Sequence, residues 1–447
     1  MVIQFRDRKN DLAAIDKAMS SKDFQLIVVY GRRRVGKTEL VLHGTSGCKR
    51  LYYLATEKNN IDRFHMACQL FDKGASRVAR DWEALFGFLK GRADAVILDE
   101  FQNMVKEDPS ILGILQSIVD IELKGSGMKL FLLGSSVSMI KSSVLAYKSP
   151  LYGRRTASIN VKPMKLADLR EFFPKESLEG LINIYGFADG IPLYLNKITG
   201  GFWSWLGKEL ASGTFLKDEA DFIVKYEFDD AGTYKLILEA LSKGMAKVNE
   251  IKDSIGAKRT DISPYLSNLI EVGLIKREVP ITETPRSRSG RYSLSDNFLR
   301  FWFRFIYPNL GMIEEGAFKA SSIKAAYPAY IGRVFEDVCR QALLKSSPIG
   351  LDKLGRWWDK GIEIDLVGLN TEAKEILFSE CKWKEGVNPK KLLSELSEKA
   401  GHVTWNQGKR KERFVLFAKS FKGRVSEWEG RPVQCLGLKE IAKALEV

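Results

Sequence analysis

The sequence predicts an α/β protein that opens with a parallel sheet and closes with a second α/β domain, with helical domains between them. Residues 1–165 alternate short apolar runs with longer amphipathic stretches, which is typical of repeated βα units. Residues 166–230 change to a helical period, and strand-like runs return after residue 326. Together these three observations favour a multidomain α/β chain.

The expected strands of residues 1–165 are short and almost entirely apolar, as in a parallel sheet that is buried on both faces. We expect these strands at Phe24–Tyr30, Lys49–Leu54, Ala95–Asp99, Lys129–Gly134 and Ala157–Val161. The helical period of residues 166–230 is clearest at Leu181–Phe187 and Leu193–Ile198. A helical domain packed against the sheet follows from this order.

Residues 231–300 have the order of a winged helix-turn-helix, in which three helices precede two strands. Those elements are expected at Thr233–Leu241, Val248–Ile255, Asp261–Val272, Leu274–Val279 and Arg291–Leu294. Pro264 stands in the first turn of the third helix and Gly273 follows its end, as expected for helix boundaries.

An aromatic-rich connector, residues 301–325, leads into the last domain, residues 326–447. Its densest part, Phe298–Pro308, is interrupted by Arg300 and Arg304, which favours a buried helix over a membrane segment. The last domain should begin with the helix Tyr330–Lys345. Strands are then expected at Ile362–Gly368, Ile376–Lys382 and Phe414–Ala418.

The composition is that of a globular protein with an excess of positive charge. The 447 residues carry a formal net charge of +14, which is suited to a polyanion such as nucleic acid or is simply the charge of a basic cytoplasmic protein. The five cysteines are scattered without metal-binding or disulfide spacing, so we expect a reducing cytoplasm. The start of the chain lacks the apolar core of a signal peptide, and no apolar run reaches the roughly 18 residues that span a bilayer.

A glycine-rich loop follows the first strand and matches the pattern G-x-x-x-x-G-K-[ST]. Its glycines let backbone N–H groups face phosphates, and the next helix adds its positive dipole end. Lys37 is expected to reach the β- and γ-phosphates of ATP, and the Thr38 hydroxyl to bind Mg²⁺. The expected nucleotide-binding residues are Gly31, Arg32, Arg33, Arg34, Val35, Gly36, Lys37, Thr38 and the adjoining Glu39.

The strand Ala95–Asp99 supplies the second half of this site, because it ends in two carboxylates. We expect Asp99 to hold Mg²⁺ through water, and Glu100 to orient and deprotonate the attacking water. A solvated acidic turn after a strand is the alternative. The preceding phosphate loop favours the functional interpretation.

Polar residues after two later segments could complete the hydrolysis site. Ser135 and Ser136 end the strand Lys129–Gly134, which is expected between the strands Phe24–Tyr30 and Ala95–Asp99. Their hydroxyls could therefore contact the γ-phosphate or water. Arg154 and Arg155 could neutralise charge on the transferred phosphoryl group. A serine-rich turn and a basic turn are the alternatives, and the choice between the arginines is open.

These motifs in this order resemble the archaeal ATPases of the AAA+ superfamily, close to the STAND signalling ATPases. The resemblance is carried by GRRRVGKTEL, VILDEFQ, the Gly134–Ser136 turn, LYGRRT and DGIPLYL. It implies an AAA+-type sheet with a helical lid, and it places Pro192 of a G-x-P motif near the nucleotide. Phe5, Arg8 and Leu12 resemble the short box before the phosphate loop, although the acidic residue there is Asp11. The C-terminal part looks like the uncharacterised domain fused to many of these ATPases.

The expected winged helix offers basic residues to DNA. A third helix of such a motif often enters the major groove, and its start carries Lys258 and Arg259. More bases occur on or beside the wing: Lys276, Arg277, Arg286, Arg288 and Arg291. The alternative is a protein-packing or lid element.

The last domain contains acidic residues in an order that resembles the PD-(D/E)xK nucleases, a restriction-endonuclease-like fold. Asp365 and Glu380 would share a divalent cation, with Glu336 as a third ligand. Glu380 and Lys382 are two apart on a strand and share a face, so Lys382 could activate a water. The alternative is a hairpin with ordinary surface charges. The tryptophans Trp357 and Trp358 could stack on a base or simply pack.

The sequence therefore predicts an ATP-binding, ATP-hydrolysing protein, and an ATP-driven machine or switch associated with DNA. One alternative is a STAND-like signalling switch whose last domain binds a partner without cleavage. Another is a metal-dependent nuclease of a defence or mobile-element system. The oligomeric state stays open, a homo-oligomer included.

Overall fold

The computed structural model describes residues 6, 8–212, 215–228, 230–257 and 261–447. These residues divide into two compact units. The first unit comprises Met1–Pro163 together with the short segments Ile191–Asn196 and Lys225–Asp229. The second comprises Met164–Gly190, Lys197–Val224 and Asp230–Val447.

A five-stranded parallel sheet with the order β2-β3-β4-β1-β5 forms the centre of the first unit. Its strands are β1 (Gln25–Tyr30), β2 (Arg50–Leu54), β3 (Ala95–Asp99), β4 (Lys129–Gly134) and β5 (Ala157–Asn160). All five predicted strands are confirmed to within a residue at each end. The expected place of β4 between β1 and β3 is confirmed as well.

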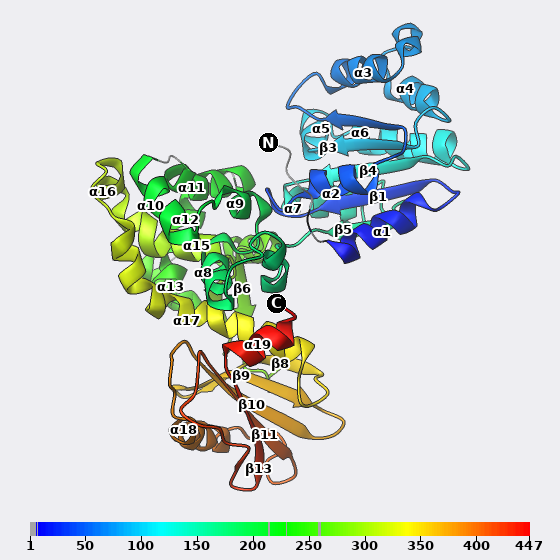
Figure 1. The fold of residues 1–447 in the computed structure, drawn as a ribbon. Helices are drawn as coiled ribbons and strands as arrows, with labels where there is room; N and C mark the ends of the chain where they lie inside the picture. The colour runs from blue at the N-terminus through cyan, green and yellow to red at the C-terminus, as the bar shows by residue number, and fades with distance from the viewer. Residues whose placement is uncertain (1–5, 7, 213–214, 229, 258–260) are drawn as a thin grey trace. The chain divides into compact units, whose positions relative to one another are not determined.

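Helices cover both faces of this sheet. The helices between β2 and β4 are α3 (Asn60–Phe71), α4 (Trp82–Leu89), α5 (Gln102–Glu107) and α6 (Ile111–Ser117). They bury a cluster that includes Phe64, Leu85 and Leu115 against one face. Figure 1 shows α1 (Lys9–Met19) on the opposite side of the sheet from α3 and α4. Ile15 of α1 packs closely on Gly44, the last residue of α2 (Lys37–Gly44).

The second unit begins with helices, among them α8 (Leu178–Ala188), α10 (Phe202–Ser212) and most of α11 (Phe215–Glu227). Three further helices and a strand pair follow in the predicted order. They are α12 (Ala231–Ser242), α13 (Val248–Ser254), α14 (Ser263–Val272), β6 (Ile275–Glu278) and β7 (Arg291–Leu294). The winged-helix interpretation of this order stays a prediction, and Lys258 and Arg259 lie outside the described residues.

The aromatic segment Phe298–Pro308 of the connector region is largely buried, as predicted. It forms α15 (Asn297–Phe301) and a π-helical stretch, Trp302–Ile306. Phe301 lies with its ring centroid 5.1 Å from that of Phe187 of α8, and the Trp302 indole donates a 2.6 Å hydrogen bond to the carbonyl of Leu216. The segment is therefore part of the core of the second unit.

A six-stranded mixed sheet follows, with the order β12-β13-β11-β10-β9-β8. Its strands are β8 (Lys353–Asp359), β9 (Ile362–Asn370), β10 (Glu375–Lys382), β11 (Lys411–Ala418), β12 (Glu427–Trp428) and β13 (Arg431–Leu436). Helix α18 (Pro389–Gly401) buries its leucines in a cluster on one face, which also contains Phe378 and Trp357. From α17, Phe335 contacts Trp383 just after β10, with ring centroids 5.1 Å apart.

Two details of this domain differ from the sequence prediction. The opening helix, α17, runs from Ala320 to Lys345 and contains Pro328, so it begins ten residues before the predicted Tyr330. Strand β8 was not predicted, and its Trp357 and Trp358 are buried at 4% and 7% exposure, so both side chains pack. None of the described helices is long and apolar enough to cross a membrane.

Candidate functional site

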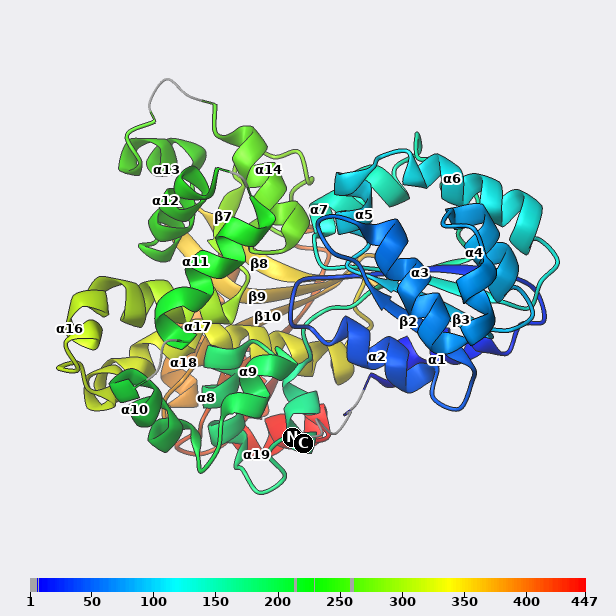
Figure 2. The ribbon, with the colours of Figure 1, turned by 90° about the horizontal axis from the view of Figure 1, so that it is seen from above.

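The phosphate loop lies between β1 and α2, at the carboxyl ends of the parallel strands (Figure 2). Gly31 needs its lack of a side chain, because a Cβ there would come 2.3 Å from the carbonyl oxygen of Val161. Gly36 adopts a φ of 90°, which favours glycine. Val35 is buried, and its carbonyl accepts a hydrogen bond from the Arg8 guanidinium. The loop is thus a tightly held backbone arch.

The Lys37 side chain is buried at 5% exposure and folds over the loop. Its amine donates hydrogen bonds to the carbonyls of Gly31 at 2.9 Å and Arg32 at 3.0 Å. Burial lowers the pKa of Lys37 to about 8, and the charges of Glu100 and Asp99 oppose that shift. A buried cation at this position is suited to a polyphosphate.

Thr38 and Asp99 lie together although 61 residues separate them. The Thr38 hydroxyl donates a 2.6 Å hydrogen bond to Oδ2 of Asp99, and Tyr52 of β2 donates another at 3.0 Å to the same oxygen. Burial and the neighbouring Asp99 raise the pKa of Tyr52. Hydroxyl and carboxylate oxygens at this edge fit Mg²⁺, which prefers oxygen ligands. Thr38 and Asp99 would hold the ion.

Glu100 follows β3 in a left-handed conformation, with a φ of 53°. Its N–H donates to Oδ1 of Asp99 at 2.8 Å. Its carboxylate accepts hydrogen bonds from Ser135 at 2.6 Å, from Tyr226 at 2.9 Å and from Gln102. The structure therefore brings Glu100 and Ser135 together beside the phosphate loop. Ser136 instead caps the helix after β4, where it accepts from the Met139 N–H at 3.5 Å.

The other predicted nucleotide-binding residues surround the loop. Pro192 begins α9 (Pro192–Lys197), and a Cβ on Gly36 would lie 3.8 Å from its Cγ. Glu39 stands in the first turn of α2. Arg34 adopts a φ of 70°, and burial lowers its pKa. These positions stay predictions for nucleotide contact.

Arg154 and Arg155 each have an intramolecular partner. The Arg154 guanidinium forms a bidentate pair with Asp120 at 2.8 and 2.6 Å and also donates to the Pro150 carbonyl at 2.8 Å. Arg155 lies over the Tyr152 ring, 5.4 Å from its centroid. Contact of either arginine with phosphate would require it to leave these partners.

The sequence interpretation missed Tyr226 and Glu227, which end α11 and belong to the first unit. The Arg33 guanidinium lies 4.3 Å from the centroid of the Tyr226 ring. Burial raises the pKa of Glu227 to about 7, against the opposing charges of Arg32 and Lys37. No local pattern marks these residues, because α11 is an ordinary amphipathic helix.

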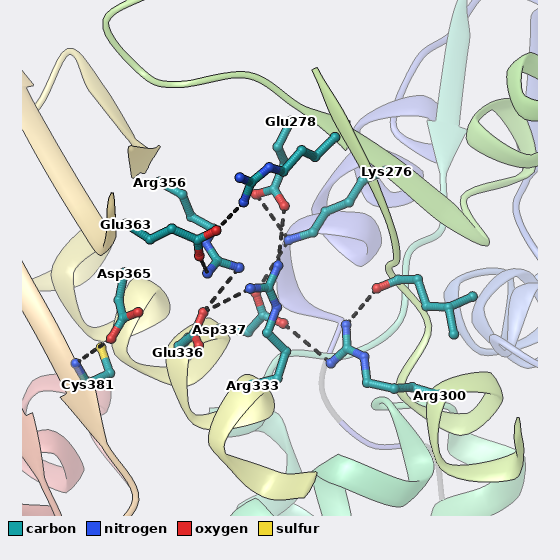
Figure 3. Close-up of polar contacts among 12 residues, drawn as sticks. Lys276, Glu278, Arg300, Arg333, Glu336, Asp337, Arg356, Glu363, Asp365 and Cys381 are labelled. Carbon is teal, nitrogen blue, oxygen red and sulfur yellow. Dashed lines mark hydrogen bonds and ion pairs between the residues drawn. The ribbon is translucent and has the colours of Figure 1, made fainter. Parts of the chain in front are cut away.

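In the second unit, the acidic residues predicted for a metal have other partners. Asp365 accepts a 2.9 Å hydrogen bond from the N–H of Cys381. Glu380 is paired with Lys382 at 2.7 Å and Lys399 at 3.1 Å. Glu336 lies 3.3 Å from Arg333 and 3.5 Å from Arg356 (Figure 3). Across the part of the chain that is described, no group of three or more His, Cys, Asp or Glu side chains could hold a metal ion.

The bases at the β6–β7 strand pair are largely engaged within the second unit. Lys276 pairs with Glu278 and with Asp337 of α17, and Arg291 pairs with Glu363 of β9. Figure 3 shows Lys276, Glu278, Asp337 and Glu363 beside Arg300, Arg333 and Arg356. A cavity of about 310 Å³ is lined by charged residues from this group, namely Glu278, Arg291, Arg300, Arg333, Arg356 and Glu363. Arg277 donates to the carbonyls of Pro285 and Ser287, whereas Arg286 and Arg288 are exposed.

Comparison with known proteins agrees with this geometry. A family model described as an ATPase domain predominantly from Archaea matches residues 5–198. A second, described as archaea bacterial proteins of unknown function, matches residues 302–400. The uncharacterized protein MJECL04 of Methanocaldococcus jannaschii is 48% identical over 387 residues, which are 85% of this chain and 88% of that protein.

Solved structures resemble the chain at low identity. The Walker-type ATPase PABY2304 of Pyrococcus abyssi matches with a TM-score of 0.50 and 20% identity, over 67% of this chain and 96% of its own. The ORC2 protein of Aeropyrum pernix matches with a TM-score of 0.43 and 15% identity, over 70% of this chain and 95% of its own. The chain therefore belongs to the family of the Methanocaldococcus protein and carries an archaeal P-loop ATPase domain at its N-terminus.

Proposed function

We propose that this ATPase couples ATP hydrolysis to work on DNA. The observation that carries the hydrolytic half is the placement of Lys37, Thr38, Asp99 and Glu100 at one edge of a parallel sheet. These residue types supply a phosphate cation, two oxygen ligands and a base, which is the set that phosphoryl transfer to water requires.

The chain's own groups divide the work. The loop N–H groups and Lys37 would bind the β- and γ-phosphates, and Thr38 and Asp99 would hold Mg²⁺. That ion, when bound, neutralises charge that develops on the phosphate oxygens. Glu100 takes the proton of the water that attacks the γ-phosphorus, while the bond from that phosphorus to the β–γ bridging oxygen breaks and ADP leaves. Ser135 orients the Glu100 carboxylate through their 2.6 Å hydrogen bond.

The DNA half of the proposal is supported by charge. The net charge is +14, and a basic protein attracts the phosphate backbone at moderate salt. Arg286 and Arg288, in the loop between β6 and β7, are exposed. We assign the phosphate contacts to this loop, because Lys276 and Arg291 are already in ion pairs.

The nuclease alternative gains no support from the C-terminal domain. Glu380 is only 4% exposed and is neutralised by two lysines, and Asp365 accepts a backbone N–H. A structural use of these carboxylates explains their contacts without cleavage. No contact among the described residues favours the STAND-like alternative. A cytoplasmic location is part of the proposal as well.

The test is ATP turnover by the full chain, measured with and without duplex DNA, single-stranded DNA and RNA. We expect Mg²⁺-dependent turnover that one nucleic acid stimulates, and intact nucleic acid on a gel afterwards. Turnover that ignores every nucleic acid would overturn the DNA half and leave the ATPase half standing. Metal-dependent cuts would instead revive the nuclease alternative.

A further inference from the structure

The last turn of α11 contacts the hydrolysis site through Tyr226. The Tyr226 hydroxyl donates to Oε2 of Glu100 at 2.9 Å and accepts a 3.0 Å hydrogen bond from Gln102. Its ring carries the Arg33 guanidinium at 4.3 Å. One tyrosine thus joins the phosphate loop to the residue proposed as the base.

This contact restricts what Glu100 can do. A carboxylate has roughly four acceptor positions, and hydrogen bonds from Ser135, Tyr226 and Gln102 fill three of them. Oε2 accepts two of these bonds, so it has no position left for a water molecule. A base must accept a hydrogen bond from the water that it deprotonates. Only one position, on Oε1, stays open beside the bond from Ser135, so the contact with Tyr226 halves the acceptor positions that Glu100 could offer to water.

We propose that Tyr226 is a positioning residue, and that Tyr226 and Glu227 form a latch that holds Glu100 at rest until ATP binds. The inference rests on the ATP hydrolysis proposed above. The triphosphate attracts Arg33 away from the tyrosine ring, and Tyr226 then loses one of its contacts. Release of Tyr226 frees Oε2 for water, so hydrolysis begins only when the loop is occupied.

Glu227 makes the same latch sensitive to the charge of the ligand. Its Oε2 is buried and accepts no hydrogen bond from the described residues. The Glu227 carboxyl interacts with the charges of Arg32, Lys37 and Arg33 on one side and of Glu100 on the other. Phosphates that bind Lys37 bring negative charge against this carboxyl and expel it. The negative charge of ATP thus attracts Arg33 and repels the carboxyl of Glu227 at the same time.

The first test compares Tyr226→Phe with the wild type in steady-state ATP turnover. The phenylalanine ring can still make the cation–π contact with Arg33, so the substitution removes only the hydroxyl. A hydrogen bond to a charged group is worth about 1.5 kcal/mol, so kcat should rise about tenfold while KM changes less than about twofold. The change should vanish in a Glu100→Gln background. Tyr147→Phe, at an exposed tyrosine of the same unit, should leave kcat unaltered.

An unaltered or lower kcat in Tyr226→Phe would overturn the latch, as would an equal gain in Tyr147→Phe. If the wild type itself shows no turnover, the ATPase proposal fails instead. A second measurement on the wild type then still tests the latch. Binding of the β,γ-imido analogue of ATP should speed amide exchange in residues 222–228. Unchanged or slower exchange in that peptide, with the analogue bound, would also overturn the latch.

Discussion

The hydroxyl of Thr38 lies 2.6 Å from Oδ2 of Asp99, although the two residues come from different strand ends. The parallel sheet produces this contact, because β4 separates β1 from β3 and all three end at the same edge. The same edge carries Lys37 and Glu100. Each of these side chains gives a separate test of the proposed chemistry.

Replacing Lys37 by alanine should weaken ATP binding at least tenfold. The substitution removes a buried cation together with its hydrogen bonds to the carbonyls of Gly31 and Arg32. A charge-assisted contact of this kind is worth about 1.5–3 kcal/mol, so the dissociation constant should rise at least tenfold. Isothermal titration with ATP and Mg²⁺ measures it. Lys73→Ala, at an exposed lysine of the same unit, serves as control and should bind normally.

Replacing Glu100 by glutamine should separate binding from hydrolysis. The amide keeps the size of the side chain but cannot take a proton from water. We expect ATP affinity within about twofold of the wild type and turnover reduced by about a hundredfold or more. Single-turnover kinetics together with titration measure both. Turnover that survives in this variant means that another residue is the base.

The stability of the first unit should fall as pH rises, because of Glu227. Burial raises its pKa from 4.5 to about 7, against the charges of Arg32, Lys37 and Arg33 and assisted by Glu100. The folded chain therefore keeps a proton that the unfolded chain has lost between these values, so stability declines through that window as pH rises. The shift is worth at most about 3 kcal/mol.

Glu227→Gln should remove this decline. The variant should match the wild type at pH 4 and exceed it in free energy of unfolding at pH 8, measured by denaturant titration. Glu57→Gln, at an exposed glutamate of the same unit, is the matched control and should track the wild type at both pH values. Parallel curves for the wild type and Glu227→Gln would contradict the assigned pKa.

The pair Arg286→Gln and Arg288→Gln should weaken DNA binding and flatten its salt dependence. Each lost phosphate contact lowers the slope of log K against log salt by about one. Fluorescence anisotropy with labelled duplex DNA at several salt concentrations gives that slope. Arg77→Gln, an exposed arginine of the first unit, should change neither quantity. A slope that stays the same in the double variant would remove this loop from the interface.

Glu380→Ala should destabilise the second unit by about 1–2 kcal/mol, because it leaves Lys382 and Lys399 beside a buried gap. Both lysines are partly exposed, so water replaces part of the lost pairing. Thermal unfolding measures the change. Glu385→Ala removes a 74% exposed partner of Lys419 and should have almost no effect. Equal melting of the two variants would show that the Glu380 pairs contribute nothing.

The sheet and the phosphate site could be predicted because their signals are local. Strands such as Ala95–Asp99 are buried on both faces and show continuous apolar runs, and the loop after β1 has a fixed spacing. Parallel topology then placed Asp99 and Ser135 at one edge. Sheet topology does not predict the contact between Tyr226 and Glu100. Tyr226 lies 126 residues later in the sequence, at the end of α11, and no strand positions it. Tyr52 was missed for a similar reason, since nothing in the strand Arg50–Leu54 distinguishes it from the adjacent Tyr53.

In the last domain, local irregularities obscured the pattern. Strand β8 has a register shift between Gly355 and Trp357, which breaks the alternation that identifies a strand. Helix α17 contains Pro328, a residue that usually breaks a helix, and it begins ten residues before the predicted Tyr330. The predicted acidic residues are present at the expected strands, but their ion partners depend on tertiary packing.

The left-handed backbone of Glu100 has a consequence for the evolution of this enzyme. Holding a non-glycine residue at a φ of 53° costs about 1 kcal/mol or more, and asparagine or glycine would relieve the strain. Random variants selected only for heat resistance should therefore lose glutamate at this position. Variants selected for ATP turnover should keep it. Selection for stability and selection for ATP turnover therefore favour different residues at position 100.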